Sequence, residues 1–302
     1  MAWASRLPWS EFVEFCEASV GERRREARVR GLTRFVASCR ARAANTSLYP
    51  VARLLLPALD KDRGSYRIKE TLLAALYTSF LQLGPTSKDA LLLKNFRAPK
   101  SNPGDTGDFA AVLYTVMKDR GYQATSLTCA EVNTTLDTIV HRSEGAEGRR
   151  EVEATLKRMF MAMSPVQQKW FVRVLLKEVR VGVGQAAVLA ALHPDAAALL
   201  DVQASLATVC AKLKDPGLRL HEVEVELGQA FRPQLADRVA IPRLEKLFGG
   251  RKFAIETKYD GERCQVHLLE DGGMACFSRC QARGPETRGP ETRGPGSPVL
   301  RP

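Results

Sequence analysis

Residues 164–184, SPVQQKWFVRVLLKEVRVGVG, form the clearest helical pattern in the chain. Ser164 can cap a helix, Pro165 suits the first helical position, and Gln167 completes a capping box. An apolar stripe at helical spacing follows, made of Trp170, Phe171, Val174 and Leu175. The segment therefore predicts an amphipathic helix whose stripe belongs to a core rather than to an interface.

Similar patterns occur upstream. Thr128 and Glu131 form a second capping box, ahead of a stripe of Val132, Leu136, Ile139 and Val140. Residues 65–84 predict another helix, closed by Gly84 and Pro85. Residues 98–108 and 142–150 are rich in turn-forming and charged residues and predict loops. No convincing strand precedes about residue 225, so we expect a mainly α fold.

The pattern changes near residue 230. Helical periodicity ends within 231–252, and Phe253, Ile255 and Thr257 then alternate as in a strand. A hairpin follows, with Asp271-Gly272 at its turn and with strand positions Cys264, Val266, Leu268, Met274 and Cys276. Residues 280–302 repeat the unit RGPET and are expected to be disordered. We thus predict a helical domain over 1–230, the start of an α+β domain over 231–279, and a tail over 280–302.

Composition narrows the class of protein. The 302 residues are 45% hydrophobic and carry a formal net charge of +11, which suits a polyanionic partner such as nucleic acid or an anionic membrane surface. The plainer alternative is a basic but otherwise ordinary soluble protein. Seven cysteines without a CxxC pair disfavour a disulfide framework and a structural zinc site. No secretory signal or membrane-length apolar run is present, so we expect an intracellular protein with reduced thiols.

An arginine-rich stretch lies near the start of the chain. Arginines occupy positions 23, 24, 25, 28, 30, 34, 40 and 42, while Val29, Leu32, Phe35 and Val36 form an inner face. The stretch is either a solvated helix face or a surface for phosphate contact. Zinc-finger spacing, an RNP aromatic box and basic-zipper heptads are all missing from the sequence, which favours backbone contact over sequence-specific recognition.

The sequence Lys258-Tyr259-Asp260-Gly261 has two interpretations. Lys258 is either an exposed turn lysine or a nucleophile that attacks the α-phosphate of ATP. As a nucleophile it must be neutral, and displacement of pyrophosphate needs Mg²⁺ and basic side chains near the phosphates. Arg263 could reach the ribose or the phosphates.

Longer segments resolve this choice by resemblance. ETKYDGER, with FSR fourteen residues beyond it, resembles the first nucleotidyl-transfer motif of ATP-dependent DNA ligases. FRPQLA (231–236) resembles the lead-in to that domain, and residues 169–196 resemble a helical segment of the ligase DNA-binding domain. Residues 48–77 and 88–110 are similar to the eukaryotic DNA ligase IV branch. The resemblance spans roughly residues 9 to 279.

The resemblance implies a fold and a site. Residues 1–230 would be an all-helical DNA-binding domain that grips duplex DNA across the minor groove, and 231–279 would begin the adenylation domain. Lys258 would be the adenylated nucleophile, with ATP and Mg²⁺ as cofactors. Glu256, Thr257 and Tyr259 would line the adenine side of the pocket, and Arg263 would contact the ribose or phosphates. No residue is predicted as a metal ligand.

The resemblance also implies a biological role. Such an enzyme joins double-strand breaks in the nucleus by non-homologous end joining and acts in V(D)J recombination. Its partners are broken or nicked duplex DNA, a coiled-coil scaffold protein bound through C-terminal BRCT domains, and a repair nuclease bound through the helical domain; no membrane is expected.

The resemblance stops after Arg279, where the family's later motifs, OB-fold and BRCT domains have no counterpart in residues 280–302. We therefore expect these 302 residues to self-adenylate poorly. The alternative is a non-catalytic fragment that binds DNA or a partner. An RNA-capping or RNA-ligase relative would share the lysine motif, but the long helical region before Lys258 disfavours it.

Overall fold

A computed structural model shows the fold of the chain. It describes residues 3–97, 107–120, 122, 124–142, 145–220, 227–228, 230–232, 238–257, 261 and 264–278. The chain divides into two compact units, Met1–Leu199 with Ser205–Glu222, and Leu200–Ala204 with Val223–Pro302. The tail predicted to be disordered, 280–302, lies outside the described residues. No helix within the described residues has the length and apolar character to cross a membrane.

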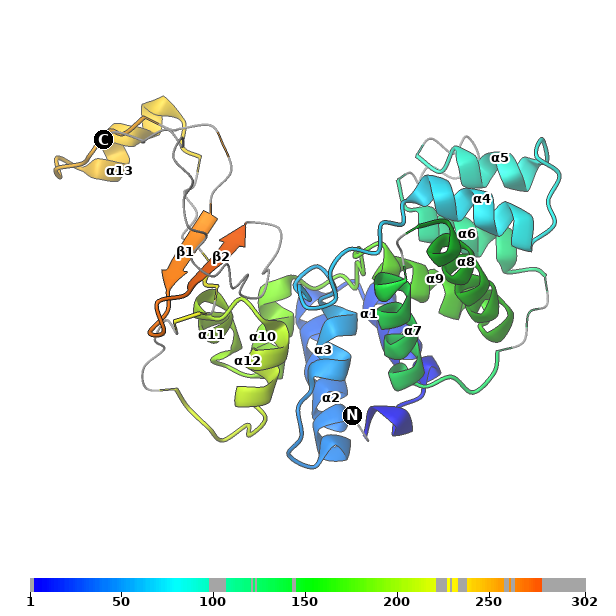
Figure 1. Ribbon diagram of the computed structural model, residues 1–302, viewed down its shortest axis with the longest axis horizontal. Coiled ribbons are helices and arrows are strands. Elements are labelled where there is room, and N and C mark those ends of the chain that lie inside the picture. Colours follow the sequence, from blue (N-terminus) through cyan, green and yellow to red (C-terminus); the bar gives the residue numbers. More distant parts are fainter. Residues whose placement is uncertain are drawn as a thin grey trace, which may run out of the picture. The chain divides into compact units, whose positions relative to one another are not determined.

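The first unit is built from helices, as Figure 1 shows. They are η1 (Ala4–Arg6), α1 (Trp9–Gly21), α2 (Arg25–Ala43), α3 (Tyr49–Leu55), α4 (Glu70–Phe80), α5 (Lys88–Lys94), α6 (Phe109–Met117), α7 (Cys129–His141), α8 (Gly145–Ala162), α9 (Pro165–Leu175), α10 (Gln185–Leu192), α11 (Ala196–Val202) and α12 (Leu206–Lys212), of which α11 runs into the second unit. The described residues of this unit contain no strand, so the predicted mainly α fold is confirmed.

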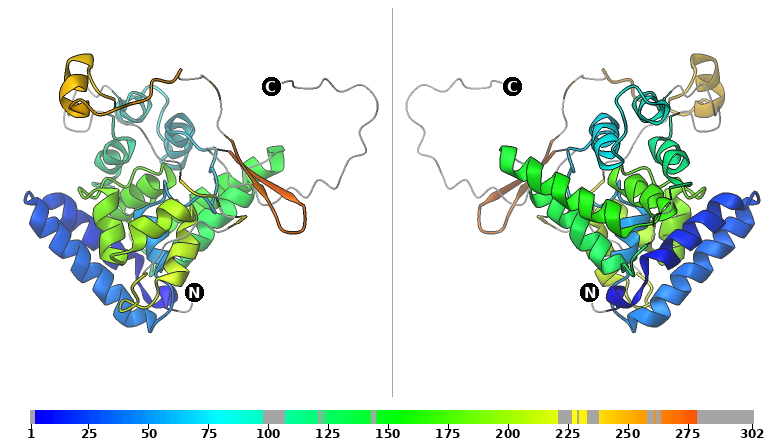
Figure 2. Two further views of the ribbon diagram at one scale, coloured as in Figure 1. Left: turned by 90° about the vertical axis from the view of Figure 1, so that its left-hand side faces the viewer. Right: turned by 90° about the vertical axis from the view of Figure 1, so that its right-hand side faces the viewer.

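Helix α9 lies at the centre of the unit. Trp170 and Phe171 are fully buried, and the helix packs against α6 and α1. Helix α1 also packs against α2, with which it forms a hairpin that is visible from two sides in Figure 2. The apolar stripe predicted for α9 is therefore core.

Two local predictions are confirmed. Thr128 caps α7 and Ser164 caps α9, each with the reciprocal bond of a capping box. Both helices begin where a side chain satisfies backbone N–H groups that the helix itself leaves unpaired.

Three predicted boundaries are wrong. Helix α4 starts at Glu70 and ends at Phe80, and the left-handed residue after it is Gln82 (φ 52°), not Gly84. The helix from Ser164 ends at Leu175, because Lys177 adopts a left-handed conformation (φ 58°). The segment predicted as a loop over 142–150 is helical from residue 145, since α8 carries a buried stripe further along. Most of the predicted loop 98–108 lies outside the described residues.

A buried ionic network fixes the loop between α3 and α4. Asp60 accepts hydrogen bonds from the Tyr49 hydroxyl (2.6 Å) and from Arg53 Nε (2.8 Å). Both terminal nitrogens of Arg53 bind the carboxylate of Asp137, and Arg63 Nε donates to the same carboxylate at 2.8 Å. Arg53, Asp60 and Arg63 are buried and Asp137 is partly exposed. All four charges are paired, so they hold the loop on α7 without leaving an unmatched ion.

The second unit contains η3 (Ile241–Arg243), α13 (Leu244–Phe248) and strands β1 (Cys264–Leu268) and β2 (Met274–Ser278). The strands are antiparallel, with Cys264 opposite Ser278, which confirms the predicted hairpin. The strand predicted over 253–257 is wrong: these residues are exposed and pair with no described strand, so no ladder holds them extended.

Candidate functional site

The predicted nucleotide site is only partly described. Glu256 and Thr257 are exposed and lie outside any helix or strand, ahead of the hairpin. Lys258, Tyr259 and Arg263 lie outside the described residues. Only two of the five predicted residues thus lie in the described part of the chain, and the roles of all five remain predictions.

The described residues do not fit a bound Mg²⁺. No three His, Cys, Asp or Glu side chains among them are arranged to hold a metal ion. Octahedral coordination of Mg²⁺ needs convergent oxygen ligands, and Glu256 alone supplies one carboxylate.

The arginines of the basic stretch fall into two groups. Three hold the fold together: Arg28 donates to the carbonyl oxygens of Glu22 and Gly182, Arg40 to those of Leu192 and Lys214, and Arg42 to the carboxylate of Glu11. The other five are exposed, and among the described residues none lies within ion-pair distance of an acid: Arg23, Arg24, Arg25, Arg30 and Arg34. Their positive charge is thus available to a ligand.

The loop between α9 and α10 adds exposed glycines to this region. Val179 and Val181 are buried, whereas Arg180, Gly182 and Gly184 are exposed. The guanidinium group of Arg180 pairs with the carboxylates of Glu178 and Asp108. Arg180 has a left-handed backbone (φ 50°), as has Gly182 (φ 76°). A non-glycine residue in this conformation is strained, and such strain concentrates at functional sites.

The first turn of α10 adjoins this loop. Gly184 occupies the N-cap without a side-chain hydrogen bond, and a Cβ built on it would meet no atom within 4 Å. Exposed backbone N–H groups at such a position attract anions. Helix α10 packs against α2, so the loop and the exposed arginines belong to one region of the first unit.

Lys177 connects the chain just after α9 to the loop between α3 and α4. Its ammonium group donates to the carbonyl oxygen of Gly64 (2.6 Å) and lies 5.5 Å from the centre of the Tyr66 ring. Burial lowers the pKa of Lys177, against the attraction of Asp60, which raises it. Lys177 is therefore a structural cation, whereas Arg180 beside it is exposed.

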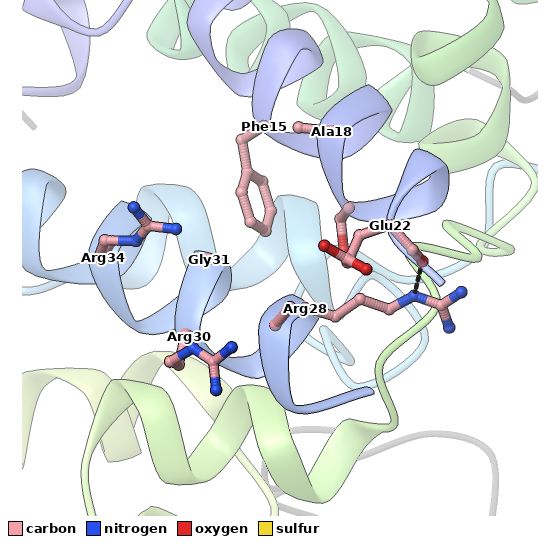
Figure 3. A pocket seen from close by; sticks show the side chains of 9 residues that line it. Phe15, Ala18, Glu22, Arg28, Arg30, Gly31 and Arg34 are labelled. Atoms are coloured by element: carbon pink, nitrogen blue, oxygen red, sulfur yellow. Dashed lines mark hydrogen bonds between the residues drawn. The ribbon is translucent and has the colours of Figure 1, made fainter. Parts of the chain in front are cut away.

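A groove of about 250 Å³ lies between α1 and α2. Figure 3 shows Phe15 pointing into the space between the two helices and Arg28 reaching Glu22. The lining is apolar at Phe15, Ala18, Ala27 and Gly31, and charged or polar at Ser19, Glu22, Arg28, Arg30 and Arg34. Phe15 stacks on Phe35 with ring centres 4.3 Å apart, so its position is fixed.

The sequence did not point to Arg180, Gly182 and Ser19 as residues of one region. A turn is indicated by the two closely spaced glycines, Gly182 and Gly184, that follow a charged run. They argue against a helix that continues through this segment. The contact of that turn with Ser19 has no local signal, because 162 residues separate Ser19 from Val181.

Comparison with known proteins gives the family. Residues 8–193 match the family model described as DNA ligase N terminus, and residues 233–289 match that described as ATP dependent DNA ligase domain. Similar proteins include DNA ligase 4 of Homo sapiens, which is 37% identical over 286 residues that make up 91% of this chain and 31% of that relative.

Two further relatives agree. DNA ligase 4 of Gallus gallus is 40% identical over 234 residues, covering 77% of this chain and 25% of the relative. DNA ligase 4 of Neurospora crassa is 35% identical over 271 residues, covering 85% of this chain and 25% of the relative. This chain thus spans less than a third of the length of these relatives.

Proposed function

Because this chain belongs to the family of ATP-dependent DNA ligases, we propose that its helical unit holds duplex DNA by the sugar–phosphate backbone. The observation that carries the proposal is the cationic region of the first unit. There, five exposed arginines of the α1–α2 hairpin lie on elements that pack against α10 and its glycine loop.

The chemistry of this region suits phosphate rather than bases. Guanidinium groups form paired hydrogen bonds with phosphate oxygens, and each phosphate they neutralise releases counterions. Exposed glycines allow the backbone of the loop to approach a strand closely. These contacts fix position on a duplex without reading sequence, as joining breaks of any sequence requires.

The whole reaction is part of the same proposal. The Lys258 amine, after losing a proton, would form a bond to the α-phosphorus of ATP while the bond from that phosphorus to the pyrophosphate oxygen breaks. Glu256, Thr257 and Tyr259 would line the adenine side of the pocket, and Arg263 would contact the ribose or phosphates. The lysine–AMP would then serve to seal the DNA break.

The relatives' name, DNA ligase 4, supports the finer proposal. By that likeness the chain would act in the nucleus, in non-homologous end joining and V(D)J recombination, with a coiled-coil scaffold protein as partner. The domain limits at 230 and 279 are part of this proposal.

Salt dependence of binding tests the DNA interface. Fluorescence anisotropy with a nicked duplex would be measured from 50 to 200 mM salt for the wild type and for the double variant Arg23→Gln/Arg25→Gln. Each lost phosphate contact should lower the slope of log K against log salt by about 0.9. Arg149→Gln/Arg150→Gln, which removes two exposed charges from α8, is the matched control. Equal losses in both variants would contradict an interface at α2.

The groove between α1 and α2 favours a second binding function, for a segment of a repair nuclease. Its apolar part accepts an aromatic side chain, and Arg30 and Arg34 at its edge favour acidic neighbours. The probe would be a short peptide with one Trp flanked by Asp residues. Gly31→Leu should block it by filling the groove, since a Cβ at Gly31 meets nothing within 4 Å. Unchanged peptide affinity in this variant would contradict the proposal.

A further inference from the structure

We infer that Ser19 and Arg28 are positioning residues that aim the backbone N–H groups of the glycine loop, residues 179–184, at a DNA phosphate. The inference rests on the proposed function, in which this loop contacts the sugar–phosphate backbone. Neither residue is itself placed against the phosphate. Both lie in the α1–α2 hairpin, on the side where it meets the loop.

Ser19 holds one carbonyl group of the loop. It is a buried polar residue of α1, and its Oγ donates a hydrogen bond of 2.7 Å to the carbonyl oxygen of Val181. A buried hydroxyl without this partner would be costly, so the bond fixes the direction of the peptide group that follows Val181.

Arg28 holds the next carbonyl group. Its Nη1 donates to the carbonyl oxygen of Gly182 at 3.1 Å, and its Nε donates to that of Glu22 at 2.6 Å. One guanidinium group thus joins the end of α1 to the loop, and Figure 3 shows its link to Glu22. A planar fork with several donors suits this double task, which a lysine cannot perform.

The backbone of Gly182 lies directly on the guanidinium group. A Cβ built on Gly182 would lie 3.0 Å from Nη1 and 3.2 Å from Cζ of Arg28. Glycine is needed at position 182 for two reasons: its φ is positive (76°), and a side chain would collide with Arg28.

The two held carbonyls set the direction of two N–H groups. In a trans peptide the C=O and N–H bonds point to opposite sides. With the oxygens of Val181 and Gly182 turned toward the α1–α2 hairpin, the N–H groups of Gly182 and Val183 point away from it. Among the described residues neither N–H has an acceptor. Successive free N–H groups of this kind bind anions.

This arrangement lowers the cost of binding. Donors fixed before the ligand arrives lose no conformational freedom when it binds, so their hydrogen bonds contribute more of their energy to affinity. Ser19 and Arg28 thus act through the loop and not on the nucleic acid.

The test uses the full chain with Ser19→Ala and Arg28→Lys. Each should weaken binding to a nicked duplex by about 3- to 10-fold, the worth of one lost hydrogen bond, with the salt slope unchanged because no phosphate-contacting cation is removed. Arg42→Lys, a bonded arginine whose partner is Glu11, should bind as the wild type does. A fall in the slope for Arg28→Lys, or unchanged affinity in both variants, would overturn the inference.

A second measurement does not depend on DNA. Trypsin should cleave after Arg180 faster in Ser19→Ala and Arg28→Lys than in the wild type, at equal melting temperature, because the loop is released. If the wild type showed no salt-dependent DNA binding, the proposed function would fail, while faster cleavage would still establish that these residues hold the loop. Equal cleavage rates in all variants would refute the positioning role itself.

Discussion

The ammonium group of Lys177 donates a 2.6 Å hydrogen bond to the carbonyl oxygen of Gly64, although 113 residues separate them. This bond ties the loop after α9 to the loop before α4. Because the latter is fixed by the network around Asp60, one partly buried cation links the loop after α9 to that network.

Lys177 should make stability depend on alkaline pH. Burial lowers its pKa in the folded chain below the ordinary value of 10.5, so just below 10.5 the unfolded chain binds more protons than the folded one. The free energy of unfolding therefore rises with pH in that window. We expect urea unfolding to show this rise in the wild type relative to Lys177→Met. Lys88→Met, at an exposed position, is the control. If the free energy of unfolding changed with pH in the same way in all three proteins, the prediction would be wrong.

Asp60→Ala should be strongly destabilising. It leaves Arg53 and Arg63 buried with one carboxylate fewer, and breaking a buried ion pair costs about 3–5 kcal/mol. Arg97→Ala, which removes an exposed partner of Glu70, should cost no more than about 1 kcal/mol. Urea denaturation measures both. Similar losses in the two variants would show that the network adds nothing beyond a surface pair.

Ser164→Ala should cost about 1 kcal/mol of unfolding free energy, the usual effect of losing an N-cap. The expected loss is local to the start of α9, but α9 is core, so it should appear in the global transition. Ser38→Ala, within α2 and without a side-chain hydrogen bond among the described residues, should leave stability equal or slightly higher. If Ser164→Ala left the free energy of unfolding unchanged, packing alone would fix the start of α9.

Labelling with ATP tests Lys258. Glu256 and Thr257 lie in an exposed segment outside any described strand, so these two residues are not held in place before ATP binds. We expect α-phosphate label from ATP and Mg²⁺ on only a small minority of chains, and none on Lys258→Ala. Lys252→Ala should label as the wild type does. Label on nearly every chain would contradict the prediction that these residues self-adenylate poorly. Label that survives Lys258→Ala would show that Lys258 is not the nucleophile.

Local patterns predicted local structure well. The caps at Thr128 and Ser164 depend on residues three positions apart, and the hairpin depends on alternation around Asp271-Gly272; each involves only neighbours in sequence. The wrong boundary at Gln82 has the opposite cause, since a non-glycine residue took the left-handed conformation where glycine was expected.

The candidate interface shows what a sequence cannot separate. Arg28 and Arg30 are two arginines on one helix, yet Arg28 binds the backbone of Gly182 and Arg30 is exposed. The difference depends on a loop more than 150 residues away, so no spacing within α2 predicts it. The strand expected at Ile255 failed similarly, because a strand requires a partner that alternation alone does not supply.

The hairpin of β1 and β2 has a consequence for handling the protein. His267, Ala275 and Phe277 face inward, while Val266, Leu268 and Met274 are each more than half exposed on the other side. Within the described residues the sheet has two strands, and neither outer edge pairs with another described strand. Such edges recruit strands from other molecules. We therefore expect Val266→Lys to raise the solubility of this chain, because a charge on this face disfavours pairing of the edges with other strands.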